Sequence, residues 1–366
     1  MTQKPAPNPK VLHIHPYVPG EAGDGGGRII KLASNESALG PSPKVREAIE
    51  VELGCLARYP DGSSTLLRQK IGEVYGLDHK HIVCGNGSEQ LIAYLAQIYA
   101  GPGDQVIQSE FGFIAYKIAT LAAGADLVAA RERDYTTDVD AILAAVTEKT
   151  KIVFLANPNN PTGTWIPASE MGRLRDKLPA HILLVLDAAY ADYAGEKEYQ
   201  AGTELVDAAI ATGAENVCML RTFSKIYGLA ALRIGWCYGP ESVIDALNRV
   251  RGAFNLSTLA QAAAIAALDD QDYMEKVRRL NNEQLPRVAS GLKKLGLGVL
   301  PSAGNFVLAK FPGGVHQARR VFTDLKKHGI ILRPVEGYRL AEFLRITIGT
   351  AEENGLLLKA LGKHFK

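Results

Sequence analysis

The sequence lacks the features that mark several classes of protein. Its four cysteines are Cys55, Cys84, Cys218 and Cys237. No two of them form a C-x-x-C pair, which argues against a zinc knuckle and against a secreted disulfide framework. No two of the eight histidines have the H-x-x-x-H spacing of a metal site. We therefore expect no metal, and the scattered cysteines fit a reducing cytoplasm best.

The sequence also lacks a large net charge of either sign. The chain has 41 Lys and Arg against 39 Asp and Glu, a formal net charge of +2, and no block of basic residues. A field this weak argues against nucleic acid as a partner. The first residues, 1–7, are polar and contain proline, so they lack the apolar stretch of a signal peptide or membrane span. We expect them to form a loose arm and expect no membrane partner.

Composition and pattern indicate a folded protein of two parts. The chain has 366 residues, of which 47% are hydrophobic and 22% charged, and this length suits two lobes. Over 40–255, short apolar runs alternate with helical segments, which predicts a mainly parallel α/β sheet. Beyond 256 the pattern predicts helices over 257–268 and 272–295 and isolated strands near 305–309 and 343–348. We predict an N-terminal arm over 1–39 that joins the smaller domain, a large domain over 40–255, and a small α+β domain over 256–366.

Two apolar runs predict strands that are covered on both faces. Residues 182–186 are apolar throughout and end in an acid, Asp187, whereas residues 151–156 end at the turn cluster N-P-N-N-P-T-G over 157–163. Open α/β sheets bind ligands at the carboxyl ends of their strands. The sequence therefore predicts that Asp187 and the turn cluster lie near a ligand.

Lys225 lies in the segment R-T-F-S-K-I-Y-G-L over 221–229, and Arg233 follows eight residues later. Only a neutral amine attacks an aldehyde, and nearby cations lower the pKa of a lysine. Thr222, Ser224 and Arg233 would suit a phosphate, because a guanidinium offers two parallel donors. The segment therefore indicates a lysine that holds an aldehyde cofactor carrying a phosphate. The alternative is an ordinary solvated lysine in a surface loop.

Two further positions indicate the same kind of ligand. The turn G-N-G-S-E over 85–89 joins an apolar run to a helix, which aims free amides at an anion, although Ser88 could simply be an N-cap. Asp187 ends a buried strand, so its carboxylate needs a partner. A pyridinium N–H would serve, but a helix cap or a core arginine would also serve. Asn160 and Tyr190 are then candidate donors to a phenolic oxygen on the same ring.

These motifs together resemble the fold-type I pyridoxal 5′-phosphate (PLP) aminotransferases, and in detail the histidinol-phosphate aminotransferase family. The match runs from about residue 15 to the end, in the family's order and spacing. The resemblance implies an α/β fold with a seven-stranded sheet, PLP as cofactor, and a homodimer. It is carried by A-S-N-E (33–36), L-G-P-S-P (39–43), R-Y-P-D-G (58–62), G-N-G-S (85–88), N-P-N-N-P-T-G (157–163), D-A-A-Y (187–190), R-T-F-S-K-I-Y-G-L (221–229) and L-R-I-T-I-G-T (344–350).

The resemblance also implies a role for each matching residue. Lys225 would form the Schiff base, Asp187 would pair with the ring nitrogen, and Asn160 and Tyr190 would contact the phenolic oxygen. Phe113 would stack on the ring, where relatives usually have a tyrosine. The implied phosphate ligands are Gly87, Ser88, Thr222, Ser224, Arg233 and, from the neighbouring subunit of the dimer, Tyr59. The implied substrate-binding residues are Tyr17, Asn35, Arg333 and Arg345, and ordinary salt bridging or packing is the alternative for Tyr17 and the two arginines.

The implied reaction is transamination of L-histidinol phosphate with 2-oxoglutarate, which gives imidazole acetol phosphate and L-glutamate in histidine biosynthesis. Aromatic amino acids are an alternative substrate class, and threonine-phosphate decarboxylation is an alternative reaction on the same fold. Two departures from the family pattern lie near the expected substrate mouth, namely N-E-S-A at 35–38 and Arg339 in place of a glycine. A PLP-binding regulator without turnover is a rival from another class. It would need a helix-turn-helix segment, for which we see no room in the first 30 or so residues.

Overall fold

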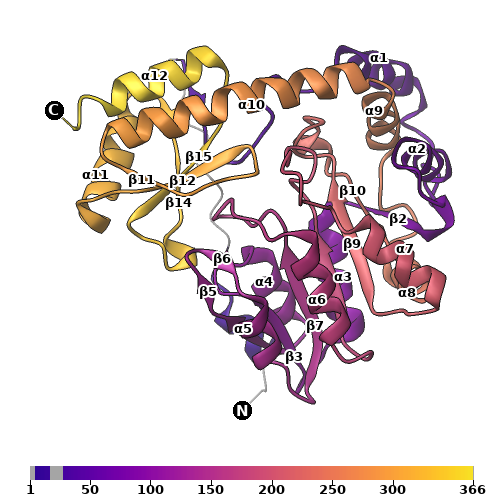
Figure 1. The fold of residues 1–366 in the computed structure, drawn as a ribbon. Helices are drawn as coiled ribbons and strands as arrows, with labels where there is room; N and C mark the ends of the chain where they lie inside the picture. Colours follow the sequence, from indigo (N-terminus) through magenta and orange to yellow (C-terminus); the bar gives the residue numbers. More distant parts are fainter. Residues whose placement is uncertain (1–4, 17–27, 366) are drawn as a thin grey trace.

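Two separate β-sheets organise the chain, and helices pack against each of them (Figure 1). The structure, a computed structural model, describes residues 5–16 and 28–365. The larger sheet has seven strands in the order β2–β10–β9–β8–β7–β3–β4 and is parallel except at β10, which confirms the predicted sheet. Its strands are β2 (Ile82–Gly85), β3 (Gln105–Ser109), β4 (Asp126–Ala130), β7 (Thr150–Ala156), β8 (Leu183–Asp187), β9 (Val217–Thr222) and β10 (Gly235–Tyr238).

Helices cover both faces of the large sheet, because the central strands are apolar on both sides. Along β8, Leu183 and Val185 face one buried cluster, whereas Leu184 and Leu186 face the other. The first face is covered by α3 (Ser88–Tyr99), α4 (Ile114–Ala122) and α8 (Glu241–Val250). The second is covered by α2 (Thr65–Tyr75), α5 (Val139–Ala144), α6 (Ala168–Lys177), α7 (Thr203–Thr212) and α9 (Thr258–Leu268), with α1 (Pro43–Glu52) packed on α9.

The smaller sheet is antiparallel and has its own core. Its order is β11–β12–β15–β14, from Gly298–Val299, Phe306–Lys310, Phe343–Thr347 and Arg333–Pro334. A separate cluster joins it to α10 (Gln271–Lys294), α11 (Gly314–Lys327) and α12 (Ala351–Leu361), and β1 (Ile30–Lys31) pairs beside it with β13 (Ile330–Ile331). The remaining short elements are β5 (Glu132–Arg133), β6 (Thr136–Thr137) and five 3₁₀ turns, η1 (Pro9–His13), η2 (Leu53–Cys55), η3 (His79–His81), η4 (Ala230–Leu232) and η5 (Glu336–Tyr338).

The helix α10 runs across the top of Figure 1 from the large sheet's helices to the small sheet. It has 24 residues, and it places Val277 in the core of the large sheet and Leu292 in that of the small one. The predicted helices over 257–268 and 272–295 are thus confirmed to within one residue. The division at residue 256 stays a prediction, and because α9 packs in the large core, a boundary inside α10 fits the contacts better.

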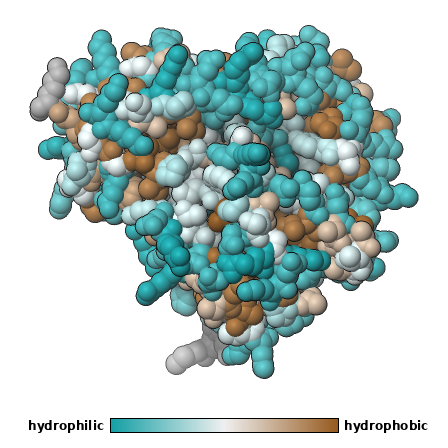
Figure 2. All heavy atoms as spheres, in the orientation of Figure 1, coloured by the Kyte–Doolittle hydropathy of each residue, from teal (hydrophilic) through white to brown (hydrophobic). Residues whose placement is uncertain are grey.

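The outer surface carries mostly polar groups. Figure 2 shows hydrophilic residues over most of one face, with hydrophobic residues in small groups between them. In the described part of the chain, no helix combines the length and the apolar character that a membrane crossing requires.

One glycine of the lysine-bearing segment is required by close backbone packing. Gly228 has a φ of +70°, and a Cβ added there would lie 2.5 Å from the carbonyl carbon of Gly40 and 2.7 Å from the nitrogen of Pro41. Both neighbours are backbone atoms, so neither can rotate away. Gly228 therefore holds the segment that follows Lys225 against the N-terminal segment at Gly40.

This packing predicts that Gly228→Ala lowers the free energy of unfolding by about 2 to 4 kcal/mol, through strain and overlap together. Gly76 is the matched control, because its φ is +68° but nothing lies within 4 Å of an added Cβ. Gly76→Ala should cost only about 1 kcal/mol, the strain alone. Urea denaturation of both variants measures the difference, and equal losses would contradict the packing argument.

Candidate active site

A cavity of about 350 Å³ lies where the two sheets meet. The large sheet contributes the carboxyl ends of β7, β8 and β9 and the amino end of α3, as expected for an open α/β sheet. The small sheet contributes Arg333 and Arg345, and the N-terminal segment contributes 33–36. The fifteen residues predicted for the site come from positions far apart in the sequence, and the fold brings twelve of them to this one cavity. Those that line it are Asn35, Ser88, Phe113, Asn160, Asp187, Tyr190, Thr222, Ser224, Lys225, Arg233, Arg333 and Arg345.

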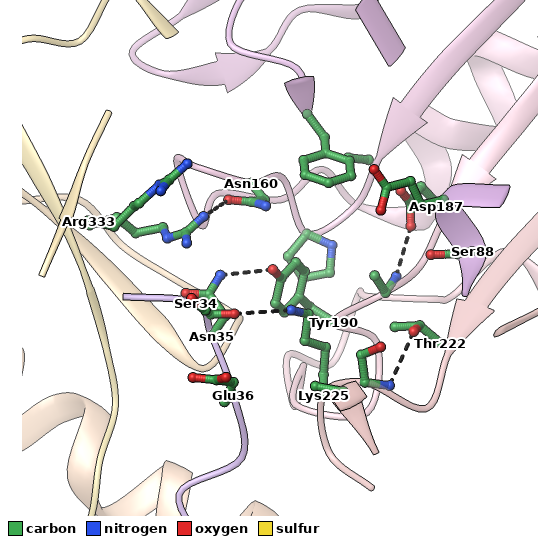
Figure 3. Close-up of a pocket in the computed structure, with 18 of the residues that line it drawn as sticks. Ser34, Asn35, Glu36, Ser88, Asn160, Asp187, Tyr190, Thr222, Lys225 and Arg333 are labelled. Atoms are coloured by element: carbon green, nitrogen blue, oxygen red, sulfur yellow. Dashed lines mark hydrogen bonds between the residues drawn. The ribbon is translucent and has the colours of Figure 1, made fainter. Parts of the chain in front are cut away.

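Lys225 extends into the cavity from the loop after β9, with its amine near Ser34 and Tyr190 (Figure 3). Its Nζ atom donates to the Ser34 carbonyl oxygen at 3.3 Å and lies 5.7 Å from the centre of the Tyr190 ring. Burial and, to a smaller extent, the nearby charge of Arg345 together lower the pKa of Lys225 to about 8. A substantial fraction of the amine is therefore neutral at mildly alkaline pH.

Asp187 is buried at the end of β8, and its carboxylate has two donors. The Tyr116 hydroxyl donates to Oδ2 at 2.7 Å and the Ala189 amide donates to Oδ1 at 3.2 Å. Side chains alternate along a strand, so Asp187 faces the same side as Leu183 and Val185, where α4 carries Tyr116. Burial raises the pKa of Asp187, and these two hydrogen bonds oppose that rise. Among the described residues, no arginine forms an ion pair with it, so the core-arginine alternative is wrong.

Tyr190 and Asn35 hold each other in place beside the lysine. The Asn35 side-chain amide donates to the Tyr190 hydroxyl at 2.8 Å (Figure 3), and the Asn35 backbone amide donates to Thr347 Oγ1 at 2.9 Å. Asn35 has a φ of +56°, a conformation that asparagine tolerates better than most residues. Burial raises the pKa of Tyr190, so its hydroxyl stays protonated at neutral pH. The N-terminal segment thus orients a phenol in the cavity.

A second part of the cavity is suited to an anion. Helix α3 begins at Ser88 after Gly87, and no side chain caps it, so its first amides remain available. Ser88 is therefore not an N-cap, and that alternative is wrong. Arg233 donates through Nη1 to the Ser224 hydroxyl at 3.3 Å, and Ser224 in turn donates its amide to Thr222 Oγ1 at 3.2 Å. These hydroxyls, the guanidinium and the helix dipole all favour negative charge at one place.

The small-sheet side of the cavity is positively charged. Arg345 of β15 is buried, and it donates to the Asn160 side-chain oxygen at 2.5 Å and to the Ala33 carbonyl at 2.7 Å. Arg333 of β14 is the direct cross-strand partner of Arg345. Two guanidinium groups therefore enter the same cavity from neighbouring strands, opposite the loop that carries Asn160.

One predicted residue of the described part of the chain, Tyr59, lies outside the cavity. Tyr59 is 81% exposed, does not line the cavity, and stacks on Phe254 with ring centres 4.5 Å apart. Its predicted role requires a second subunit, which this single chain cannot test. Tyr17 lies outside the described residues. Gly87 contributes through its backbone, beside the Arg233 guanidinium.

Sequence reasoning missed Tyr116, which is fully buried and stacks on Phe154 of β7 with ring centres 4.7 Å apart. The only signal was a tyrosine three residues after Phe113 in a largely apolar helix, a pattern that many core tyrosines share. It also missed Tyr338, which lines the cavity from the small domain. Neither residue stands in a motif, so only the fold reveals them.

The cavity fits pyridoxal 5′-phosphate, which has an aldehyde, a ring nitrogen and a phosphate. A Cβ at Gly87 would lie 2.7 Å from Arg233 Nη2, so only glycine leaves room for a phosphate beside that guanidinium. Lys225 could hold the aldehyde carbon, and Asp187 could face the ring nitrogen. Fold and cavity together define the class of PLP-dependent enzymes built on a large mainly parallel sheet.

Comparison with known proteins agrees with this class. The sequence model of the aminotransferase class I and II family matches residues 27–361. The histidinol-phosphate aminotransferase of Paramagnetospirillum magneticum is 50% identical over 98% of each chain, and that of Rhodospirillum centenum is 48% identical over 99%. The crystal structure of histidinol-phosphate aminotransferase from Sinorhizobium meliloti in complex with PLP has a TM-score of 0.90 at 32% identity, covering 97% of this chain and 96% of that one.

The chain therefore belongs to the class I and II aminotransferases, which depend on PLP, and within them to the histidinol-phosphate aminotransferase family. The resemblance inferred from the motifs is confirmed, as are the enzyme class and the cofactor.

Proposed function

We propose that this enzyme transfers an amino group from L-histidinol phosphate to 2-oxoglutarate, which yields imidazole acetol phosphate and L-glutamate in histidine biosynthesis. The observation that carries the proposal is the pair of neighbouring arginines, Arg333 and Arg345, in one cavity. Arg345 suits the anionic end of either substrate, and Arg333 suits the phosphate that ordinary amino acids lack. Relatives named for this reaction, up to 50% identical, support the same substrate.

We propose that Lys225 has two tasks. When bound, the cofactor supplies an aldehyde and a ring that withdraws electrons from the substrate's alpha carbon. Because its pKa is about 8, the Lys225 amine can be neutral. It would hold the aldehyde group of the bound cofactor and, once released from it, would accept the alpha proton at Nζ and return it. The Ser34 carbonyl and the Tyr190 ring orient that amine.

The other residues of the cavity have supporting roles in this proposal. Asp187 would hold a proton on the ring nitrogen, and the buried Tyr116 hydroxyl stabilises its charged form. Tyr190 and Asn160 would donate to the phenolic oxygen, and Phe113 would cover one face of the ring. Gly87, Ser88, Thr222, Ser224 and Arg233 would bind the phosphate, and Asn35 would hold Tyr190 and border the substrate.

We propose further that the active unit is a homodimer in which Tyr59 reaches the neighbouring subunit's cofactor phosphate. An exposed apolar patch supports this proposal, because such patches on a single chain mark interaction surfaces. We define this patch as the exposed large apolar side chains of segment 51–66 together with Phe254, which stacks on one of them; they are Val51, Leu53, Leu56, Tyr59, Leu66 and Phe254. Tyr59 and Phe254 are stacked within it, so a partner would meet a preformed aromatic surface. A cytoplasmic location stays a prediction from the cysteines.

Lys225→Ala should lower kcat by roughly 10³-fold or more, because the variant loses both the covalent anchor and the proton carrier. The bound cofactor should also lose the visible absorbance of its lysine adduct. Lys276→Ala, which changes an exposed lysine on α10, is the matched control and should behave like the parent. Retention of the adduct absorbance by Lys225→Ala would show that another amine holds the cofactor.

Substrate choice tests the proposed reaction directly. We expect kcat/KM for histidinol phosphate to exceed that for phenylalanine by about 100-fold, because only the former has a phosphate for Arg333. Arg333→Ala should reduce the value for histidinol phosphate about 10- to 100-fold, and that for phenylalanine much less. Phenylalanine thus serves as the control within the same variant. If the ratio of kcat/KM for histidinol phosphate to that for phenylalanine is near or below one in the unmutated protein, the proposed substrate is wrong and an aromatic aminotransferase is favoured.

The dimer is tested by charging its proposed interface. Leu56→Glu should convert the protein to a monomer in sedimentation-velocity experiments and reduce its retention of PLP, because an uncompensated charge is costly in an apolar interface. Leu356→Glu on α12 is the control, since Leu356 is also exposed but lies outside the patch. A parent protein that sediments as a monomer at working concentration would rule out the dimer.

A further inference from the structure

Glu132 lies beside the cavity but has no part in the chemistry described above. It belongs to β5, which forms a short hairpin with β6 directly after β4, the edge strand of the large sheet. Its carboxyl group contacts the segments that follow β3 and β7. Those two segments are the ones that carry Phe113 and Asn160 into the cavity.

The carboxyl group of Glu132 joins these two segments through one oxygen. Oε1 accepts from the Phe111 amide at 3.2 Å and from the side-chain amide of Asn159 at 3.4 Å. The same Asn159 amide lies 3.3 Å from the Phe111 carbonyl oxygen. Glu132, Phe111 and Asn159 therefore form a three-way junction, in which the acid is the group that accepts from both sides.

Only short lengths of chain separate this junction from the cavity. Phe113 follows Phe111 by two residues, and Asn160 follows Asn159 directly. Asn160 in turn accepts from Arg345 at 2.5 Å. A shift of either segment at the junction would therefore move the aromatic ring or the asparagine–arginine pair by a similar distance.

Glu132 is half-buried, and its carboxyl group is costly to keep there for packing alone. Its Oε2 atom is buried without a hydrogen-bond partner. The pKa of Glu132 is raised to about 7, chiefly by burial and also by the charge of Glu110, although the Ser109 hydroxyl and the Phe111 amide oppose the rise. The other charged groups nearby are engaged elsewhere, because Arg133 pairs with Asp138 and Arg339 with Glu110. An apolar side chain would cost less there unless the accepting oxygen served the site.

The hairpin also touches the small sheet. Tyr135, in the turn between β5 and β6, has its ring centre 5.7 Å from that of Phe111 and 5.3 Å from that of Phe343 on β15. Strand β15 carries Arg345. The hairpin of Glu132 thus contacts all three pieces of chain whose relative placement sets this side of the cavity.

We propose that Glu132 is a positioning residue for transamination, which fixes the Phe111 turn and the Asn159 loop against each other and so sets Phe113 and the Asn160–Arg345 pair in the cavity. This inference rests on the proposed function of that cavity. Glu132 acts through Phe111 and Asn159.

Two variants of Glu132 test this role. The control is Glu148→Gln, which changes an exposed acid in a loop away from the cavity. Glu132→Ala should lower kcat about 10- to 100-fold with a smaller change in KM, because misplacing a reacting group affects the rate more than binding. Glu132→Gln keeps the accepting oxygen and should restore kcat to within about threefold. The visible circular dichroism of bound PLP should change in Glu132→Ala and return in Glu132→Gln.

A double-mutant cycle with Asn159→Ala separates positioning from general damage. If Glu132 and Asn159 act through one junction, the double variant should lose no more kcat than the worse single variant, whereas multiplied losses would overturn the proposal. The unfolding temperature of each variant without PLP is a further control. If kcat falls only in proportion to the loss of unfolding temperature, the proposal is also overturned. If Glu132→Ala does not fold, Glu132→Gln and Asn159→Ala still test the junction through kcat and dichroism. An inactive parent protein would instead overturn the proposed function.

Discussion

The chemistry of this protein depends on the burial of one amine. Lys225 lies in the loop after β9 of the large sheet, but two of the groups around its amine come from other parts of the chain: Ser34 from the N-terminal segment and Arg345 from the small sheet. Removing water and adding a nearby cation both favour a neutral lysine. The reactive state of the amine therefore exists only when the segments are assembled, so the two-part architecture is a condition of the reaction.

The same dependence explains the arrangement of charge across the cavity. The amino end of α3 and Arg233 lie on one side, whereas Arg333 and Arg345 enter from the small sheet. An anion at each end would place the reacting atoms between them, beside Lys225. Binding energy from the two anionic ends can thus position the centre, as expected for an enzyme whose cofactor and proposed substrate both carry phosphate.

Much of this could be predicted from the sequence, because short motifs report local structure. The apolar run before Asp187 predicted a strand covered on both faces, and β8 has that character since its side chains alternate between two buried clusters. The lysine segment and the glycine turn likewise reach one cavity. The contacts of Tyr116, Tyr338 and Glu132 could not be predicted, because each is made between elements that are far apart in the chain and no spacing encodes them. The surroundings of Tyr59 in a dimer could not be predicted in detail either, because they would be formed by a second chain.

Helix α10 has a consequence for how the molecule loses its structure. Its 24 residues form one continuous helix that contains Pro286, and it places Val277 in one core and Leu292 in the other. Helical order is cooperative along its length, so fraying that starts at either anchor weakens the other. Heat should therefore melt the two lobes in a single step, and the cavity between them should disappear at the same temperature as both cores.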